Sequence, residues 1–153
     1  MDLILWRHAE AEDEREGLSD MDRSLTPKGL KQASRMAAWL DRQLPESTRV
    51  LASPARRTEQ TVQALGRKYK LRPELAPGAT PAQLLQVAQW PEGKAAVLVV
   101  GHQPTIGQTV AQLLGLDDPS FSVKKGAVWW LRQREREGQF QTVLVAVQAP
   151  ETI

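Results

Sequence analysis

Residues 3–8 read Leu-Ile-Leu-Trp-Arg-His, an apolar run that stops at an arginine and a histidine. Residues 95–102 repeat the arrangement, because the run Ala-Ala-Val-Leu-Val-Val is followed by Gly101 and His102. Both runs are typical of strands buried in a parallel sheet. A third apolar run, residues 50–52, leads into Ser53-Pro54-Ala55-Arg56-Arg57. In open α/β sheets ligands bind beyond the carboxyl ends of the strands, so the sequence predicts a site where these three ends meet.

Apolar runs alternate along the chain with segments of helical periodicity. This alternation predicts an α/β fold with a mostly parallel sheet between two layers of helices, a three-layer α/β/α sandwich. Each expected helix opens on a polar residue followed by proline, a pair that is favoured at helix starts. The four pairs are Thr26-Pro27, Ser53-Pro54, Thr80-Pro81 and Gln103-Pro104, and Gly115 is a suitable C-cap for the last helix.

The buried face of each helix is expected from residues spaced three or four apart. In the first helix these residues are Leu30, Ala33, Ala37, Leu40 and Leu44, and Pro45 ends the helix. In the other three they are Thr58, Val62, Leu65 and Tyr69, then Leu84, Leu85 and Ala88, then Ile106, Val110, Leu113 and Leu114.

The remaining strands are expected in two places. Residues 71–75 form a short predicted strand. Near the C-terminus, residues 127–132 and 140–147 have strand character and are separated by a polar turn at 134–138. The sheet is therefore expected to end in a hairpin.

Length and composition favour one domain over residues 1–153, because the chain has 153 residues and 41% hydrophobic residues. The absence of cysteine excludes disulfides and thiolate-bound zinc. The apolar run directly before Arg7 has only four residues, too few for a signal peptide, and no run reaches membrane-spanning length. We therefore expect a cytoplasmic protein with no membrane partner, and a monomer.

Aromatic residues argue against a nucleic-acid partner. The five tryptophans (Trp6, Trp39, Trp90, Trp129 and Trp130) fall in expected core elements and do not alternate with arginines, as a base-stacking surface requires. Trp129 and Trp130 are expected in the strand core, with a partner surface as the alternative.

Charge is unevenly distributed. Residues 9–22 hold seven acidic residues and one arginine, a net charge of −6, so the rest of the chain carries +8 against an overall +2. This segment directly follows His8 and would repel a long polyanion from that side. Two interpretations stay open: a solvated loop, or a segment that selects a basic or protein-borne substrate.

The residues at the three strand ends suit an oxyanion, with phosphate as the expected one. A neutral histidine such as His8 can attack phosphorus when a hydrogen bond on its other nitrogen fixes the tautomer. Arg7 and Arg57 offer guanidinium groups that match phosphate oxygens. His102 can donate a hydrogen bond to a phosphoryl oxygen, and the helix starts after Ser53 and Gln103 add backbone N–H groups. Two histidines among arginines, with no third ligand beside them, make a poor metal site, so no metal or other cofactor is expected.

Four motifs in order along the chain resemble those of the histidine phosphatase superfamily, also called phosphoglycerate mutase-like. Residues 5–9 (Leu-Trp-Arg-His-Ala) are similar to its Arg-His-Gly motif, and residues 25–29 (Leu-Thr-Pro-Lys-Gly) to its Leu-Thr-x-x-Gly element. Residues 53–61 (Ser-Pro-Ala-Arg-Arg-Thr-Glu-Gln-Thr) resemble its Ser-Pro-x-x-Arg-Ala-x-Gln-Thr segment, and residues 99–104 resemble its second-histidine motif.

The resemblance implies a phosphoglycerate mutase-like fold in which His8 is the phosphorylated nucleophile. It also implies that Arg7, Arg57 and His102 complete the phosphate pocket. Arg57 takes the position of the family arginine, so Arg56 is an additional basic residue expected to contact substrate.

Within the superfamily the chain resembles the short SixA-type phosphohistidine phosphatases, which share Arg-His-Ala and lack the inserted segments that cover the site in mutases. Larger relatives have a glutamate in a glycine-rich segment that protonates the leaving oxygen. The corresponding residues 73–79 contain only Glu74, which precedes the turn, and we do not expect it to be the proton donor.

A site without a general acid has consequences for the substrate. Expulsion of an alkoxide needs a proton, and general acid catalysis contributes about 10² to 10⁴ in rate. The imidazole of phosphohistidine can be protonated before or during cleavage, so such a site favours a phosphorylated protein. The expected reaction has two steps: His8 takes the phosphoryl group, and water then releases phosphate without a metal. The alternatives are a small-molecule phosphomonoesterase acting on a sugar or nucleotide phosphate, a mutase, or a phospholigand-binding module without catalysis.

Overall fold

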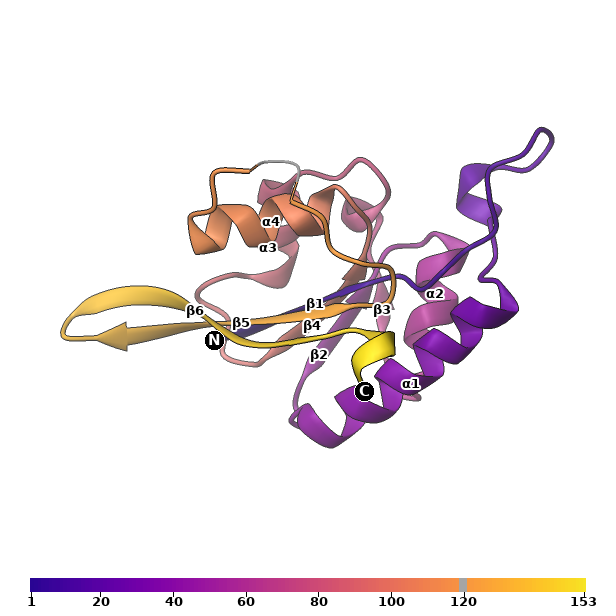
Figure 1. Ribbon diagram of the computed structural model, residues 1–153. Helices are drawn as coiled ribbons and strands as arrows, with labels where there is room; N and C mark the ends of the chain where they lie inside the picture. Colours follow the sequence, from indigo (N-terminus) through magenta and orange to yellow (C-terminus); the bar gives the residue numbers. More distant parts are fainter. Residues whose placement is uncertain (119–120) are drawn as a thin grey trace.

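The fold is built on one six-stranded sheet of order β3-β2-β4-β1-β5-β6, seen in a computed structural model that describes residues 1–118 and 121–153 (Figure 1). Strands β3, β2, β4 and β1 run parallel, whereas β5 pairs antiparallel with β1 and with β6. The strands are β1 (Asp2–Arg7), β2 (Arg49–Ala52), β3 (Lys70–Leu71), β4 (Val97–Gly101), β5 (Val128–Arg136) and β6 (Gln139–Gln148).

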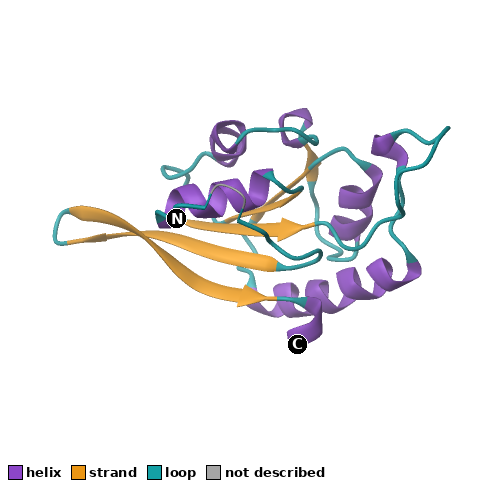
Figure 2. Ribbon diagram, turned by 45° about the horizontal axis from the view of Figure 1, so that its top comes forward, coloured by secondary structure: helices purple, strands orange, loops and turns teal. Residues whose placement is uncertain are grey.

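In the described part of the chain the α-helices lie on the two faces of this sheet (Figure 2). They are α1 (Pro27–Gln43), α2 (Arg56–Gln63), α3 (Pro81–Ala88) and α4 (Thr105–Leu114), with short 3-10 turns η1 (Asp20–Asp22), η2 (Pro73–Leu75) and η3 (Pro150–Thr152). Alternate residues of each strand face opposite layers. Leu3 and Leu5 join the cluster that includes α3 and α4, whereas Ile4 and Trp6 join the cluster of α1 and α2. The predicted three-layer α/β/α sandwich is confirmed.

The helix starts agree with the sequence at two of the four pairs. Thr26 caps α1 by accepting a hydrogen bond from the N–H of Gly29, with Pro27 as the first helical residue. Thr80 and Gln83 form a complete capping box at α3. Helix α4 begins at Thr105, one residue after Pro104, and Gly115 ends it in the left-handed conformation as expected.

The predicted start of the second helix at Ser53-Pro54 is wrong. Helix α2 begins at Arg56, because Ala55 still has an extended backbone and is the N-cap. The Ser53 hydroxyl does not cap the helix but contacts the ring of His102. Tyr69 therefore lies beyond this short helix, which ends at Gln63.

The buried face of α1 departs from the prediction at Leu30, which is 51% exposed. Ala33, Ala37, Leu40 and Leu44 are buried as expected, and Met36 joins them. Leu30 is displaced because its neighbour Gly29 takes the inner position, where the helix abuts the main chain of Glu10.

Most of the residues expected to face inward from the three shorter helices are buried: Thr58, Val62, Leu65, Leu84, Ala88, Ile106 and Val110. Leu65, like Tyr69, lies beyond the end of α2 and not on it. Leu85, Leu113 and Leu114 are only partly buried and pack at the edge of the core cluster that contains Ile106.

The predicted strand at residues 71–75 is also wrong. Strand β3 is only Lys70–Leu71, and Pro73–Leu75 turns as the 3-10 segment η2. Pro73 has no N–H to donate to a ladder, so the strand cannot continue through it. Leu75 is nevertheless buried.

The C-terminal hairpin is confirmed, with longer strands and a tighter turn than expected. Strands β5 and β6 pair up to Arg136 and Gln139, which leaves only Glu137 and Gly138 for the turn. Both turn residues have positive φ, at 53° and 78°, and two-residue hairpin loops of this kind match the twist of their strands. Most of the polar segment 134–138 therefore belongs to the strands.

The tryptophans of the hairpin serve the core. Trp130 is buried and lies edge-on to Trp39, with ring centroids 6.4 Å apart. Trp129 is partly buried against Phe121. Among the described residues no helix is long and apolar enough to span a bilayer.

Candidate active site

His8 and His102 come from neighbouring parallel strands and meet at the carboxyl end of the sheet. The register pairs Arg7 with Gly101, so the two histidines that follow lie side by side. Their ring centroids are 5.3 Å apart and the ring planes meet at 57°. Both side chains are buried. The sequence prediction that His102 lies within a few ångströms of His8 agrees with these positions.

The tautomer of His8 follows from its hydrogen bond. Its Nδ1 lies 2.7 Å from the carbonyl oxygen of Ala9, which can only accept, so Nδ1 carries the proton. Nε2 is then left with its lone pair. Burial lowers the pKa of His8 to about 3, with Arg57 and Arg7 adding to the effect and the Ala9 carbonyl opposing it. At neutral pH the ring is uncharged and nucleophilic at Nε2.

The main chain beside His8 is held from three sides. Thr61 accepts a hydrogen bond from the N–H of Ala9 at 3.1 Å, and Gln32 accepts from the N–H of Glu10 at 2.9 Å. The carbonyl of Glu10 accepts from the N–H of Thr26. The His8 side chain therefore projects from a fixed backbone, as a preorganised site requires.

His102 is held by Ser53, which follows strand β2. The His102 Nε2 atom lies 2.7 Å from the Ser53 hydroxyl oxygen, and this hydroxyl also accepts a bond from the N–H of Ala55. Burial lowers the pKa of His102 to about 3, followed by the effects of His8 and Arg57. His102 is therefore also uncharged at neutral pH.

Arg7 and Arg57 bring two guanidinium groups to the same place. Arg7 donates from Nη1 to the carbonyl of Val123 at 2.8 Å. Arg57 is 3% exposed and donates from Nη1 to the carbonyl of Asp20 at 2.7 Å. Burial lowers the pKa of both arginines, but not enough for either to lose its charge near pH 7.

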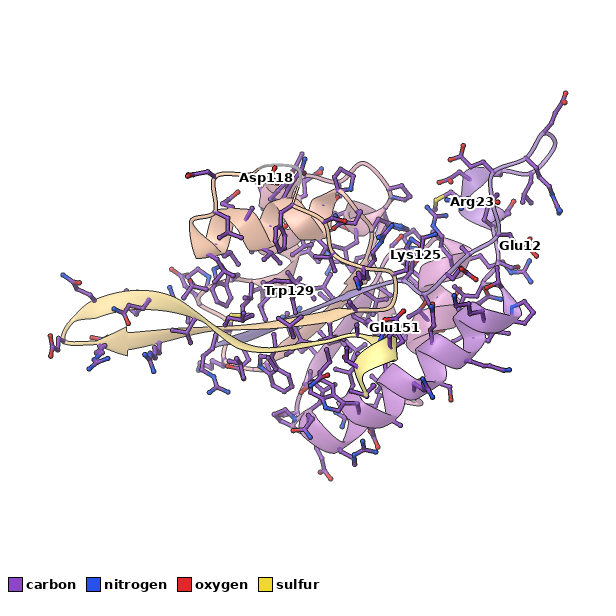
Figure 3. All side chains as sticks on the ribbon, viewed as in Figure 1. Glu12, Arg23, Asp118, Lys125, Trp129 and Glu151 are labelled. Carbon is purple, nitrogen blue, oxygen red and sulfur yellow. The ribbon has the colours of Figure 1, made fainter. Side chains whose placement is uncertain are left out.

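The acidic segment contributes one carboxylate to this site. Asp20 Oδ2 lies 3.1 Å from Arg57 Nη2, and Asp20 Oδ1 contacts Arg23. Arg23 also donates to the carbonyl of Glu12 at 2.7 Å, within the loop after β1 that Figure 3 shows. Burial opposes the effect, but Arg23 and Arg57 hold the pKa of Asp20 below its ordinary value.

Sequence reasoning missed Asp20 and Arg23 as site residues, and read Ser53 only as a helix cap. The spacing of Asp20 and Arg23 permits an ion pair, but nothing local indicates that both lie beside Arg57. Ser53 directly follows a buried strand, which was the available signal for it.

Two other residues discussed above lie apart from the histidines. Arg56 is exposed in the first turn of α2, outside the buried cluster of histidines and arginines. Glu74 is paired with Arg72 at 2.6 Å, after strand β3. Among the described residues no three metal-ligating side chains converge.

Three buried side-chain nitrogens lack a hydrogen-bond partner in the described part of the chain: Arg7 Nε, Arg57 Nε and His102 Nδ1. Buried polar groups are almost always paired, because an unpaired one costs about 1 to 3 kcal/mol. All three belong to the cluster around His8. Two of the unpaired nitrogens belong to charged arginines and one to a neutral histidine. Together they suit a ligand with several acceptor oxygens.

Known proteins resemble this chain in sequence and in fold. Residues 3–80 match the histidine phosphatase superfamily (branch 1). The phosphohistidine phosphatase SixA of Escherichia coli strain K12 is 36% identical over 133 residues, 80% of each chain. The SixA homolog of Haemophilus influenzae is 33% identical over 135 residues, 78% of this chain and 80% of the homolog.

A solved structure agrees over nearly the full length. The protein histidine phosphatase SixA in complex with tungstate superimposes with a TM-score of 0.77 at 30% identity, covering 98% of this chain and 97% of that one. The fold, the motifs and these relatives together show that the chain belongs to branch 1 of the histidine phosphatase superfamily and is SixA-like, with a phosphoglycerate mutase-like fold.

Proposed function

We propose that this protein is a metal-independent phosphatase that takes a phosphoryl group onto His8 Nε2 and then releases it to water, with phosphohistidine in a protein as its substrate. The observation that carries the proposal is the set of unpaired buried nitrogens on Arg7, Arg57 and His102 around a neutral His8. A phosphoryl group has oxygens that accept from such donors, and a phosphorus atom for the His8 lone pair to attack.

The reaction proceeds in two in-line displacements. In the first, His8 Nε2 forms a bond to phosphorus while the bond to the leaving nitrogen breaks, and the leaving imidazole keeps the electron pair and takes a proton. In the second, a water oxygen forms a bond to phosphorus while the bond to His8 Nε2 breaks. Nε2 keeps the electron pair, one proton of the water passes to solvent, and inorganic phosphate leaves. In both steps Arg7, Arg57 and His102 stabilise the charge on the equatorial oxygens, which is the main source of catalysis in phosphoryl transfer.

The proposed substrate class rests on the ionisation state of two carboxyl groups, Asp20 beside Arg57 and Glu74 after strand β3. Asp20 is paired with Arg57 and Arg23, and its lowered pKa keeps it ionised at neutral pH. Glu74 is paired with Arg72, which lowers its pKa. Neither is a protonated carboxylic acid that could protonate an alkoxide. A phosphoramidate needs no such acid, because its imidazole can be protonated by solvent.

The relatives support the same substrate class. Two of them are named for phosphohistidine phosphatase activity, and the solved SixA structure holds tungstate, a tetrahedral oxyanion that resembles phosphate. We propose, by extension, a single domain over residues 1–153 that acts as a monomer in the cytoplasm, with Arg56 at the rim contacting the phosphorylated partner.

The test is release of phosphate from a chemically phosphorylated histidine protein, beside a phenolic and an alkyl phosphate ester. We expect fast turnover of phosphohistidine, slow hydrolysis of the alkyl ester, and no turnover by His8→Ala. Fast hydrolysis of the alkyl ester would instead reveal a general acid and favour a small-molecule phosphatase. Absence of turnover with all three substrates would leave a phospholigand-binding module as the better account.

A further inference from the structure

Ser53 stands between strand β2 and helix α2 with no part of its side chain exposed. Its hydroxyl oxygen has two neighbours: His102 Nε2 at 2.7 Å, and the N–H of Ala55, which donates to it at 3.2 Å. The contact with His102 joins residues 49 positions apart in the chain. Ser53 is therefore the one hydrogen-bond partner of the His102 ring among the described residues.

We propose that Ser53 is a positioning residue: its hydroxyl donates to His102 Nε2, holds the ring proton on Nδ1, and makes Nδ1 a donor to the transferred phosphoryl group. The role of His102 Nδ1 as a donor to the phosphoryl group rests on the proposed function. The assignment of the ring proton to Nδ1 does not depend on that function.

The direction of the hydrogen bond follows from counting protons on the Ser53 hydroxyl. A serine hydroxyl has one proton to donate and two lone pairs that accept. The N–H of Ala55 occupies one lone pair. If His102 Nε2–H also donated, the serine proton would have no acceptor among the described residues, and a buried unpaired donor costs about 1 to 3 kcal/mol. Donation from Ser53 to the Nε2 lone pair satisfies the hydroxyl and Nε2 and leaves only Nδ1–H without a partner, whereas the reverse direction leaves both the serine proton and the Nδ1 lone pair without one.

The consequence appears at the opposite nitrogen of His102. A neutral imidazole carries one proton, so acceptance at Nε2 places that proton on Nδ1. Nδ1 is one of the three buried atoms without a partner, and the others belong to Arg7 and Arg57. With the proton on Nδ1, all three atoms are N–H donors that a ligand with acceptor oxygens can pair. With the proton on Nε2, Nδ1 would present a lone pair that repels phosphoryl oxygens.

The charges around His102 favour the neutral ring, which carries a single proton. The groups that act on it are His8, Arg57, Asp20 and Arg7, and all but Asp20 disfavour a second proton on the ring. His102 therefore cannot donate from both nitrogens as an imidazolium near neutral pH. The hydrogen bond from Ser53 therefore determines which ring nitrogen of His102 carries the proton.

Long-range ¹H–¹⁵N NMR of the full ¹⁵N-labelled chain measures the proton position directly, because the two tautomers have different cross-peak patterns. The chain has only two histidines, and His102→Asn identifies which signals belong to His102. We expect the Nδ1–H pattern for His102 in the wild-type protein between pH 6 and 8. An Nε2–H pattern in the wild-type protein would overturn the proposal.

Variants connect the tautomer with Ser53. In Ser53→Ala nothing holds the proton on Nδ1, so we expect Nε2–H or a mixture, while Ser53→Thr keeps the hydroxyl and the wild-type pattern. Thr58→Val is the matched control, because the Thr58 hydroxyl is buried in the same segment and donates to the carbonyls of Ser53 and Ala55 without touching His102. An unchanged pattern in a folded Ser53→Ala would contradict the role of Ser53.

Kinetics then separate the positioning role from the proposed function. We expect Ser53→Ala to lower kcat for phosphohistidine about 10- to 100-fold, with KM changed little and recovery in Ser53→Thr. This loss is smaller than the roughly 10²- to 10³-fold that follows removal of such a donor, because the His102 ring is still present. A Ser53→Ala kcat equal to that of wild type would overturn the role of Nδ1 as donor. If the wild-type protein turned over no phosphorylated substrate, the proposed function would fail while the NMR result still decided the tautomer.

Discussion

The Asp20 carboxylate lies 3.1 Å from Nη2 of Arg57, so the guanidinium expected to bind phosphate already holds an anion. The main-chain carbonyl of Asp20 accepts a second bond from Nη1 of the same arginine at 2.7 Å. Arg23 binds the same carboxylate. A phosphoryl group that binds Nη2 of Arg57 would bring a second negative charge beside the Asp20 carboxylate, whose side chain is 42% exposed and so has room to move away.

Removal of this carboxylate charge is expected to tighten anion binding. Because Asp20 is well exposed, its pair with Arg57 stabilises the free protein by only about 0.5 to 1 kcal/mol, so Asp20→Asn should bind tungstate roughly 2- to 5-fold more tightly. Isothermal titration of tungstate against both proteins measures the difference. Asp22→Asn is the control, since it removes a charge from the same turn but no contact with Arg57. Weaker tungstate binding by Asp20→Asn would mean that the carboxylate holds Arg57 in place.

The two buried histidines predict a loss of stability on mild acidification. Each has a pKa of about 3 in the folded protein and an ordinary value near 6.5 when unfolded. The unfolded state therefore binds more protons between these values, so stability is complete above about pH 6.5 and falls as the pH drops below it. The slope reaches about 1.4 kcal/mol per pH unit for each histidine.

Urea unfolding between pH 5 and 7.5 tests this slope. The carboxylates Asp2 and Asp20 have lowered pKa values in the folded protein and titrate near 3.9 when unfolded. Their titration therefore changes the free energy of unfolding mainly below about pH 5, outside this range. Replacing His102 by Asn should therefore flatten the pH dependence of unfolding by up to about 1.4 kcal/mol per pH unit. Equal slopes in wild type and variant would show that His102 titrates alike in both states.

The arrangement of the site was predictable because it depends on strand ends and parallel pairing. Arg7, His8 and His102 follow apolar runs, and a parallel sheet brings such ends together whatever the details of the loops. Arg57 was placed by its position in the first turn after the Ser53-Pro54 pair. The predicted start of α2 was wrong, since the helix begins three residues after Ser53. Arg57 nevertheless lies in its first turn, as expected.

What the sequence could not predict is determined by contacts between distant segments. The pairing of Asp20 with Arg57 joins residues 37 apart, and the bond between Ser53 and His102 joins residues 49 apart. Leu30 fits the helical stripe of α1, but the close approach of Gly29 to Glu10 turns it outward. Periodicity describes one element at a time and carries no information about which neighbour an element meets.

Glu74 offers a prediction of no effect. It is paired with Arg72 and does not touch either histidine, so Glu74→Gln should keep kcat and KM for phosphohistidine within about 2-fold of wild type, well below the 10²-fold or greater loss that follows removal of a general acid. The alkyl ester gives the sharper comparison, because only its cleavage needs an acid. A large loss for the ester alone would identify Glu74 as the missing proton donor.

Gly29 should be irreplaceable for steric reasons. A Cβ at this position would overlap the carbonyl oxygen of Glu10, which accepts the N–H of Thr26 and lies two residues from His8. Alanine is intrinsically the better helix former by about 1 kcal/mol, but forcing main chains apart in a packed region costs about 1 to 3 kcal/mol or more, so the clash wins. We expect Gly29→Ala to lower the free energy of unfolding and to reduce kcat by moving the backbone that carries His8.

Lys28→Ala, at an exposed position of the same turn, is the control and should keep both values. Chemical denaturation measures the change in stability, and phosphohistidine turnover measures the change in kcat. A Gly29→Ala protein more stable than wild type would show that the main chain around Glu10 moves aside without a cost in free energy.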